Sequence, residues 1–405
     1  MIRKVTLLSA LYFAQGLPYG FQSNALGNFL YKGGMSKTAV TLLGLLAAPW
    51  LFKALWSPLV DRHGSLTFGR RKSWIVPLQG LMGLCCVLAA FTSPKETITP
   101  LLVLIFLLNL FAATQDIAVD GLTVSLLDEK ELGWGNAIQV VGYKVGMLMG
   151  GGFLVSLSAR IGWNGMFFAM AALCWGVMAN TYFFDERSST EQPKERLHVK
   201  DVFLTLKKAL ALPGTVWLLV FVASYKVGEV MAEKVFSLFV IDHGITPETL
   251  GEWFGTYGTV ASLSGSLLGG VLASRWRLLP AVGVTAALRV LPLAIQWALT
   301  AGVIPFSQTN VIAINCTEHF FAGALTTAMF AFMMSKVDRK IGATHYTLLA
   351  SVEVLGKMPG GLLSGKVADA TSYATVNAFA TIASLLFLLL LIPMTLAAKK
   401  APSAA

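Results

Sequence analysis

The feature that most constrains this chain is its repetition of long apolar segments. A helix needs about 20 mostly apolar residues to cross roughly 30 Å of hydrocarbon, and twelve segments of the chain are that long and that apolar. Only 13% of the residues are charged, whereas a soluble domain averages about 25%, so a water-soluble globule is excluded. The sequence predicts an all-α membrane protein with twelve transmembrane helices. They are expected over residues 5–30, 38–60, 73–92, 99–126, 135–158, 163–184, 213–242, 248–273, 279–299, 306–334, 345–366 and 372–397.

The first segment begins like a signal peptide, since a basic flank precedes an apolar run in MIRKVTLLSALYFAQGLPYG. It has no small-residue cleavage site of the A-x-A kind. Its polar Gln15 and Gln22 suit a functional helix better than a leader. We therefore expect an uncleaved first transmembrane helix.

The formal charge of +10 is distributed as membrane topology requires. With the N-terminus inside, twenty Lys and Arg residues fall in the cytoplasmic segments and five in the outer loops. This asymmetry follows the positive-inside rule and predicts that both termini are cytoplasmic. The basic character therefore reflects topology and does not indicate nucleic-acid binding. The four cysteines lie within predicted helices without metal-ligand spacing, and no metal or cofactor is expected.

The longest polar interruption, residues 185–212, divides the chain in two. Residues 1–184 would form one six-helix bundle and residues 213–405 a second, with an amphipathic helix in the linker along the cytoplasmic membrane face. Short matches recur across the linker at an offset near 212: SPLVDR (57–62) with GVLASR (270–275), and GMLMGG (146–151) with GKMPGG (356–361). They indicate an internal duplication like the parallel repeats of transporters.

The glycines of the second match have two candidate roles. Small residues four positions apart let helices approach closely, and in a transporter the same surfaces are where two bundles rock. The sequence leaves both roles open. The residues concerned are Gly146, Gly150, Gly356 and Gly360.

Twelve ionisable residues lie inside the predicted helices. Each would cost roughly 2.5–3.5 kcal/mol at the centre of the bilayer on insertion scales. They are therefore expected to line an aqueous cavity or to pair within the bundle. Six are basic and six are acidic: Lys53, Lys144, Lys226, Lys234, Arg289 and Lys357, and Asp116, Asp120, Glu229, Glu233, Glu318 and Glu353.

Helical spacing gathers polar groups onto common faces. Asp116 and Asp120 are one turn apart in FAATQDIAVDGL, and Asn109 and Thr123 extend the same face. On the first helix, the spacing aligns a stripe of polar and aromatic side chains, which are Tyr12, Gln15, Tyr19 and Gln22.

Static ion pairs compete with functional roles for these charges. Glu353 with Lys357, and Lys226 with Glu229, have the spacing of intrahelical ion pairs. Lys53, near the inner end of the second helix, is expected to extend to the cytoplasmic surface.

Other charged groups have no such partner on their own helices. Lys144 and Arg289 lack an acidic neighbour there, which makes them candidates for holding an anionic substrate. Glu318 beside His319 is a candidate proton site, because histidine titrates near neutral pH and a desolvated glutamate can be shifted toward it. A mutually satisfied polar pair remains the alternative.

The two aspartates of the fourth helix also have two interpretations. Each could couple transport to protons, or could hold a basic residue such as Lys53 or Lys144 from a neighbouring helix. We favour the ion-pair role for Asp116 and the proton-coupling role for Asp120.

The loop SPLVDRHGSLTFGRRKSW (57–74) resembles the signature loop of the major facilitator superfamily. In that family, an Asp and several basic residues form a gating charge network on the cytoplasmic side. An ordinary positive-inside cluster would explain the basic residues but not the Asp at the helix end. The matching positions are Asp61, Arg62, Arg70, Arg71 and Lys72.

Further motifs resemble one branch of this superfamily, which joins the AmpG muropeptide permeases to the acetyl-coenzyme A transporters. They are YFAQGLPYG (12–20), LWSPLVDR (55–62), FGRRKSW (68–74), TQDIAVDG (114–121) and GYKVGMLMGGG (142–152). QVVGYKVG and LFVIDHGI are most similar to major facilitator superfamily domain-containing protein three. The resemblance implies transport by alternating access, coupled to protons as in AmpG-like members or working by exchange as in coenzyme A carriers. It also implies that spans one, four, seven and ten line the cavity and that the protein is a monomer. The compact chain favours a bacterial inner membrane.

The function favoured is secondary transport of an organic anion or amphiphilic conjugate, muropeptide-like or acetyl-coenzyme A-like. No G-x-x-x-x-G-K-[ST] sequence occurs, so transport driven by ATP is disfavoured. An intramembrane enzyme using Asp116 and Asp120, or a receptor without transport, are the alternatives. The substrate-binding candidates are Tyr12, Gln15, Tyr19, Gln22, Lys144, Lys226, Arg289 and Lys357. The proton-coupling candidates are Asp116, Asp120, Glu229, Glu318 and His319.

Overall fold

The computed structural model describes residues 2–26, 43–65, 67–92, 98–128, 130–186, 199–211, 214–245 and 247–400. Apart from an isolated β-bridge between Ser65 and Gly69, the regular structure within these ranges is helical, which confirms the all-α fold class. Within the described residues, each of the twelve predicted segments overlaps a helix or a run of consecutive helices. Residues 27–30 and 38–42 of the first two segments lie outside the described residues, as do residues 187–198 and 212 of the predicted linker and residue 213 of the seventh segment.

Six of the described helices are long and apolar enough to cross a membrane by length and composition alone. They are Lys72–Ala90, Thr99–Leu126, Arg160–Tyr182, Thr215–Asp242, Leu278–Thr300 and Tyr373–Ala397. Gln308–Ser335 and Arg339–Ala370 pass the same test as a pair bent by 107°, which raises the number to as many as seven.

The chain forms two compact units. Unit 1 comprises Met1–Asp128, Ile138–Thr205 and Val337–Thr347. Its helices are α1 (Ile2–Gly20), η1 (Phe21–Leu26), η2 (Leu43–Ala47), α4 (Ala48–Phe52), η3 (Lys53–Leu55), α5 (Ser57–Arg62), α6 (Lys72–Ala90), α7 (Thr99–Leu126), η4 (Met149–Phe153), α9 (Leu154–Tyr182), η6 (Arg339–Ile341) and most of α8 (Leu132–Leu148).

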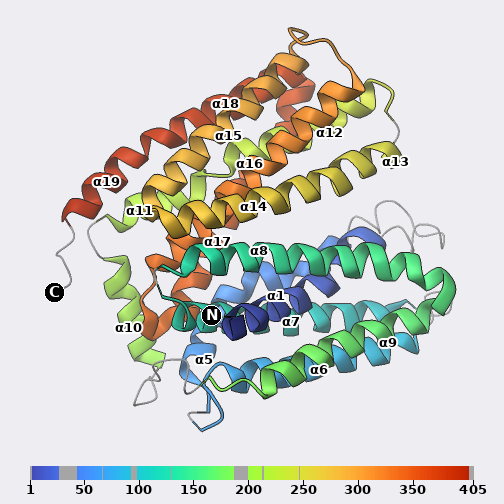
Figure 1. Ribbon diagram of the computed structural model, residues 1–405, viewed down its shortest axis with the longest axis vertical. Coiled ribbons are helices and arrows are strands. Elements are labelled where there is room, and N and C mark those ends of the chain that lie inside the picture. Colours follow the sequence, from blue (N-terminus) through green and yellow to red (C-terminus); the bar gives the residue numbers. More distant parts are fainter. Residues whose placement is uncertain are drawn as a thin grey trace. The chain divides into compact units, whose positions relative to one another are not determined.

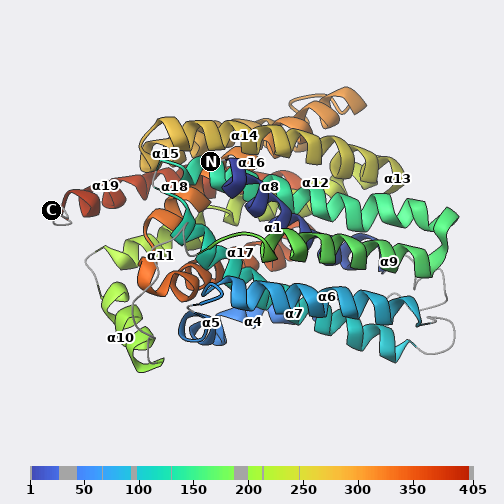
Figure 2. The same cartoon turned by 60° about the horizontal axis from the view of Figure 1, so that its bottom comes forward.

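The core of unit 1 lies among α6, α7 and α9, which run side by side (Figures 1 and 2). Apolar side chains from all three helices meet there, including Met82, Ile105 and Phe167, and each is almost wholly buried. Helix α7 also contacts α1 and the segment 48–55, which lie on its polar side.

Unit 2 comprises Glu129–Ala137, Leu206–Lys336 and Leu348–Ala405. Its helices are α11 (Thr215–Ser224), α12 (Val227–Asp242), α13 (Pro247–Leu250), η5 (Gly251–Tyr257), α14 (Gly258–Arg275), α15 (Leu278–Thr300), α16 (Gln308–Ser335), α18 (Tyr373–Leu389), α19 (Leu391–Lys400) and most of α17 (Gly342–Ala370). The amphipathic helix α10 (Val199–Leu210) bridges the two units in sequence. Helix α16 packs on α14 and α15, and α18 packs on α12 and α15 (Figure 1).

Glycines bring α1 and the α8–η4 segment of unit 1 into backbone contact. A Cβ atom on Gly146 would lie 2.1 Å from the carbonyl oxygen of Phe13. One on Gly150 would lie 2.0 Å from the carbonyl oxygen of Leu17. Neither distance is sterically allowed, so the packing role predicted for these two glycines is confirmed.

The same contacts recur in unit 2. A Cβ atom on Gly356 would lie 2.2 Å from the carbonyl oxygen of Ala223, and one on Gly360 would lie 3.2 Å from that of Val227. These four residues of unit 2 each lie 210 positions after a residue of the unit 1 contact. Their counterparts, in the same order, are Gly146, Phe13, Gly150 and Leu17. The inferred duplication therefore extends to matched helix contacts, with an offset of 210 in place of the expected 212.

Candidate functional site

One face of α7 carries a buried polar ladder. Its members lie at the predicted positions along the helix, and the structure confirms that they share contacts with α1 and the segment 48–55. All four are at most 8% exposed: Asn109, Asp116, Asp120 and Thr123.

Asp116 forms an ion pair with Lys53, which also lies 5.5 Å from the centre of the Trp50 ring. This confirms the interpretation of Asp116 as the partner of a basic residue. The expectation that Lys53 extends to the cytoplasmic surface is wrong, because the side chain turns inward from η3 and is buried. A buried lysine is tolerated there because the carboxylate offsets the cost of taking its charge out of water.

Asp120, one turn further along α7, is bonded differently. Its Oδ1 atom accepts a hydrogen bond of 2.9 Å from the hydroxyl of Tyr12 and a long one of 3.5 Å from Nε2 of Gln139. The Tyr12 hydroxyl also lies 3.1 Å from Oγ1 of Thr123. In the described part of the chain, the hydrogen bonds to this carboxyl group therefore come from neutral donors.

The predicted stripe on α1 and η1 divides between two environments. Gln22 accepts a 2.5 Å hydrogen bond from Asn109, whose Oδ1 accepts one of 3.0 Å from Trp50. Gln15 is fully buried, and neither of its amide atoms has a hydrogen-bond partner among the described residues.

Tyr19 belongs to an aromatic cluster on the same side of unit 1. Its ring centre lies 5.9 Å from that of Tyr143 and 6.4 Å from that of Trp50. Lys144, next to Tyr143 on α8, is half-buried. Tyr12 and Gln22 thus face the ladder of α7, whereas Tyr19 packs among rings.

In unit 2, Arg289 of α15 joins two carboxylates from other helices. Its Nη2 atom lies 3.4 Å from Oε2 of Glu229 on α12 and 2.5 Å from Oε1 of Glu318 on α16. The sequence singled out Arg289 because its own helix has no acid. The structure shows that two neighbouring helices supply acids, so its charge is already engaged.

His319 continues this cluster. Its Nδ1 atom lies 2.8 Å from Oε2 of Glu318 and 3.1 Å from the carbonyl oxygen of Asn315. Both neighbours are acceptors, so Nδ1 carries a proton and Nε2 is the nitrogen that can gain one. Nε2 lies along the edge of the ring that faces Gly258 of α14, where a Cβ atom would be only 3.1 Å away.

A second cluster joins Lys226 and Lys357 to a single carboxylate. Oε1 of Glu353 lies 3.5 Å from Nζ of Lys226 and 2.9 Å from Nζ of Lys357, and it accepts a 3.4 Å hydrogen bond from Tyr225. The Glu353–Lys357 pair is therefore confirmed. Lys226 pairs with this carboxylate and not with Glu229, because it lies at the break between α11 and α12, where helical i to i+3 geometry ends.

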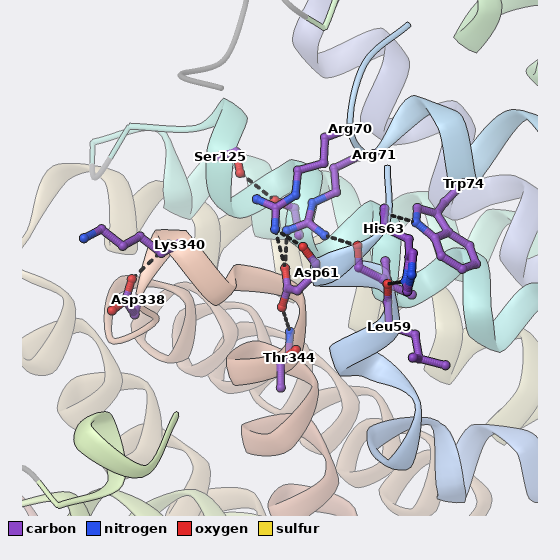
Figure 3. Close-up of polar contacts among 12 residues, drawn as sticks. Leu59, Asp61, His63, Arg70, Arg71, Trp74, Ser125, Asp338, Lys340 and Thr344 are labelled. Atoms are coloured by element: carbon purple, nitrogen blue, oxygen red, sulfur yellow. Dashed lines mark hydrogen bonds and ion pairs between the residues drawn. The ribbon is translucent and has the colours of Figure 1, made fainter. Parts of the chain in front are cut away.

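The signature loop of unit 1 forms a compact charge network around Asp61 (Figure 3). Its Oδ1 atom lies 2.5 Å from Nη2 of Arg71 and 3.8 Å from that of Arg70, which also donates to its backbone carbonyl oxygen. Its Oδ2 atom accepts a 2.7 Å hydrogen bond from the backbone N–H of Thr344, in the first turn of α17. Such N–H groups are unpaired within a helix and favour a carboxylate. Arg62 is exposed.

Sequence reasoning missed Glu186, which completes this network from the end of α9. Its carboxylate accepts hydrogen bonds of 2.9 Å and 2.8 Å from the backbone N–H groups of Arg71 and Lys72, at the start of α6. Gly69, at φ +113°, makes room for it, since a Cβ atom there would lie 2.5 Å from Oε2 of Glu186. The glycine in FGRRK was the one available signal.

Arg70 is the one member of this network with a shifted pKa outside the membrane-spanning segments. Burial, and after it the neighbouring Arg71, lower its pKa to about 10 against the opposing effects of Asp61 and Glu186. Arg70 thus remains a cation at neutral pH.

Known proteins share both the sequence and the fold. Residues 4–171 match the family model described as acetyl-coenzyme A transporter 1. The chain is 28% identical over 397 residues to the anhydromuropeptide permease of Escherichia coli strain K12, covering 95% of this chain and 78% of that protein. It is 27% identical over 372 residues to the putative transporter AmpG 4 of Rickettsia conorii, covering 89% and 88%.

The fold is similar to the crystal structure of the major facilitator superfamily transporter FucP in its outward conformation. The TM-score is 0.70 at 14% identity, covering 96% of this chain and 97% of that one. This likeness agrees with the expected twelve-helix architecture. The chain is thus similar in sequence to the AmpG permeases and to the acetyl-coenzyme A transporter model, and similar in fold to a major facilitator superfamily transporter.

Proposed function

We propose that this protein is a proton-coupled secondary transporter that moves an organic anion or amphiphilic conjugate by alternating access. The names of its relatives suggest a muropeptide-like or acetyl-coenzyme A-like substrate. The distribution of basic residues supports cytoplasmic termini, and the similarity to bacterial AmpG proteins supports a bacterial inner membrane. A monomer is expected by analogy with the major facilitator fold alone.

The observation that carries the proposal is the contrast between the two aspartates of α7. Asp116 has a lysine partner, whereas Asp120 is bonded by the neutral Tyr12 and Gln139. An anionic carboxylate without a cation is expensive inside a membrane. A carboxyl group in this position is therefore suited to take up a proton on one side and release it on the other.

The residues around Asp120 can serve both of its protonation states. The Tyr12 hydroxyl donates to the carboxylate, and a protonated carboxyl group can instead donate to that oxygen, whose own proton can then turn to Oγ1 of Thr123. The same hydrogen-bonded site thus persists while its charge changes. This is what a coupling group requires.

The Asp61 network supports the alternating part of the cycle. It joins the loop between α5 and α6 to the first turn of α17 through Thr344, a residue that lies far along the sequence. Contacts of this kind can form in one state of a transporter and break in another. In unit 2, Lys226 and Lys357 are candidates to supply positive charge for an anion. In unit 1, the candidate is Lys144.

The two aspartates do not form the shared-proton pair that an intramembrane hydrolase would need. Asp116 is engaged by Lys53, so the two carboxyl groups differ in their environment and cannot act as equals. The geometry therefore favours transport over the enzymatic alternative.

The proposal is tested with protein reconstituted in liposomes under an imposed pH gradient. Uptake of an anhydromuropeptide and of acetyl-coenzyme A is measured for the native protein and for Asp120→Asn. We expect gradient-driven accumulation by the native protein and its loss in the variant. Counterflow, in which labelled and unlabelled substrate exchange without net proton movement, should survive.

A matched control removes the ion pair of Asp116, one turn from Asp120, and leaves neither partner unpaired. The double variant Lys53→Met/Asp116→Asn should keep its response to the gradient. Native uptake that ignores the pH gradient would contradict proton coupling. An Asp120→Asn variant that still accumulates substrate would remove Asp120 from the coupling role.

A further inference from the structure

The charged side chains of unit 2 form two ionic clusters of alternating sign, which Lys226 and Glu229 bring within electrostatic reach of each other, and the two together are called the network. We infer that this network binds one proton, on His319, together with one monoanionic group, between Lys226 and Lys357. The inference rests on the proposed transport function, because it assigns a substrate class and a coupling rule to it. The network's seven members, in order, are Lys357, Glu353, Lys226, Glu229, Arg289, Glu318 and His319.

Contacts connect the members within each of the two clusters. Glu353 bridges the two lysines, and Arg289 bridges Glu229 and Glu318. Lys226 precedes the first turn of α12, which contains Glu229, and it lies within electrostatic reach of both Glu229 and Arg289. We therefore expect a charge gained in one cluster to act on the other across Lys226 and Glu229.

The charge count gives the coupling rule. With neutral His319, three cations face three carboxylates and the network carries no net charge. A proton on His319 leaves one surplus positive charge, and a monoanionic group alone would leave one surplus negative charge. Either surplus is costly away from water, whereas both ligands together restore neutrality. Proton and anion should therefore bind cooperatively.

His319 is the member that can accept the proton. Nδ1 is bonded to Glu318 and Asn315, and Nε2 lies at the Gly258 edge of a side chain that is 22% exposed. Charged groups on three elements act on the ring: Glu318 on α16, Arg289 on α15 and Glu233 on α12. Glu233 is exposed, unlike the carboxylates of the network. The ring of Phe254 from η5 covers another side, at 6.4 Å between ring centres.

The anion site lies where the lysines converge. Both ammonium groups and the hydroxyl of Tyr225 point to the same oxygen, Oε1 of Glu353. One carboxylate oxygen thus satisfies two cations that could each bind another. Lys357 is the accessible member, with 27% of its side chain exposed against 6% for Glu353. An incoming carboxylate can therefore approach through Lys357.

The size of the surplus charge selects the ligand. One added proton is balanced by one negative charge, which a carboxylate provides. A phosphate monoester carries between one and two negative charges near neutral pH, and a polyphosphate carries more, so either would leave the network negative. The site therefore favours a carboxylate-bearing solute over a nucleotide-like one.

The three members of this anion site are not repeated at the matching positions of unit 1. The positions 210 residues before Lys226, Glu353 and Lys357 are occupied by Gly16, Tyr143 and Met147, none of which carries a charge at neutral pH. The charge that unit 1 carries on this pair of helices, Lys144, lies at a different register, next to Tyr143.

The test measures binding to the purified full-length protein in detergent, where no gradient exists. The probe is 1,6-anhydro-N-acetylmuramyl-L-alanine, which has one carboxylate, and the matched comparison is its C-terminal amide. Imidazole ordinarily titrates near pH 6.5, so we expect the acid to bind about tenfold more tightly at pH 6 than at pH 8. The amide should bind more weakly, with little dependence on pH.

Three variants separate the parts of the inference. His319→Gln should remove the pH dependence, and Lys357→Gln should remove the preference for the acid over the amide. Glu353→Gln adds one positive charge without a proton, so it should bind the acid at pH 8 about as tightly as the native protein does at pH 6. Lys366→Gln, an exposed lysine two turns further along α17, should change neither property.

Equal binding of acid and amide by the native protein would overturn the inference, as would no binding of either. Tighter binding of acetyl-coenzyme A than of the acid would overturn the monoanion preference. A pH dependence that survives in His319→Gln would overturn the proton site. Proton-linked acid binding without gradient-driven uptake in liposomes would support the inference about the network and contradict transport, so the two failures are distinguishable.

Discussion

The two units use the same helix contacts to carry opposite chemistry. The carbonyl oxygens of Phe13 and Ala223 each receive a glycine from a partner helix, Gly146 or Gly356, at positions 210 residues apart. The side chains around these contacts differ completely. In unit 1 they are Gly16, Tyr19, Tyr143 and Met147, and in unit 2 the equivalent positions are Lys226, Glu229, Glu353 and Lys357.

This difference separates what packing requires from what function requires. Glycines are kept where two backbones touch, because any side chain would collide with a carbonyl oxygen. One of the neighbouring positions also decides the packing, since a Cβ atom on Gly16 would lie 2.1 Å from the carbonyl oxygen of Tyr143. At the others, unit 1 has two aromatic rings and a methionine, whereas unit 2 has charged groups that belong to its ionic clusters.

The largest effect should come from breaking that network at its centre. Arg289→Gln would leave Glu229 and Glu318 facing each other without their shared cation. Removing one partner of a buried ion pair typically costs about 3–5 kcal/mol, so we expect a large fall in Tm and in the yield of folded protein. Thermal unfolding in detergent measures it.

The double variant Arg289→Gln/Glu318→Gln is the control for this change. It removes one carboxylate together with the cation and should recover part of the lost stability, since one fewer charge is left unpaired. If the single variant were as stable as the native protein, the network would be solvated and not a buried unit.

Breaking the ion pair of unit 1 should have a smaller effect. Lys53→Met leaves one unpaired carboxylate, Asp116, where Arg289→Gln leaves two. Leaving a single buried group without its partner should cost roughly 1–3 kcal/mol. Thermal unfolding measures it, and the double variant Lys53→Met/Asp116→Asn, which leaves no unpaired carboxylate, should be close to native. A loss as large in the double variant as in the single one would mean that the unpaired carboxylate is not the cause.

These contacts also show how far sequence reasoning reaches. The ladder on α7 was predicted because helical period alone places Asp116 and Asp120 on one face. The partner of Arg289 was not predicted, because its acids come from two other helices and no spacing within one helix can reveal them. Lys53 was assigned to the surface because its partner, Asp116, also lies on a different helix.

The signature loop marks another boundary of such reasoning. Its basic residues and Asp61 were found by resemblance. Glu186 was missed, because its role depends on where the end of α9 meets the start of α6. The apolar segments were enough to predict the helices. Contacts between side chains of different helices could not be predicted, because they depend on how the helices pack.

Substitution of repeat-related glycines should expose an asymmetry between the units. Gly150→Ala would place a methyl group 2.0 Å from the carbonyl oxygen of Leu17, whereas the nearest atom to the same group on Gly360 is the flexible Met231 side chain at 3.1 Å. We expect Gly150→Ala to cost about 1–3 kcal/mol and Gly360→Ala less than half as much. Gly146→Ala and Gly356→Ala, at 2.1 and 2.2 Å from backbone oxygens, should be equally harmful. Thermal unfolding ranks all four, and equal losses at Gly150 and Gly360 would contradict the asymmetry.

The smallest effect is expected at the position 210 residues before Arg289, which is Gln79 of α6. Gln79 is fully buried in unit 1, and neither of its amide atoms has a hydrogen-bond partner among the described residues. Replacing an unpartnered buried amide with an apolar side chain of similar volume removes a desolvation cost, so Gln79→Leu should leave Tm unchanged or raise stability by roughly 1 kcal/mol. A fall in Tm would mean that the amide is bonded to water, and unit 1 would then carry a polar site at the same point in the repeat where unit 2 carries its arginine. A neutral or stabilising result would leave the charged network as a property of unit 2 alone.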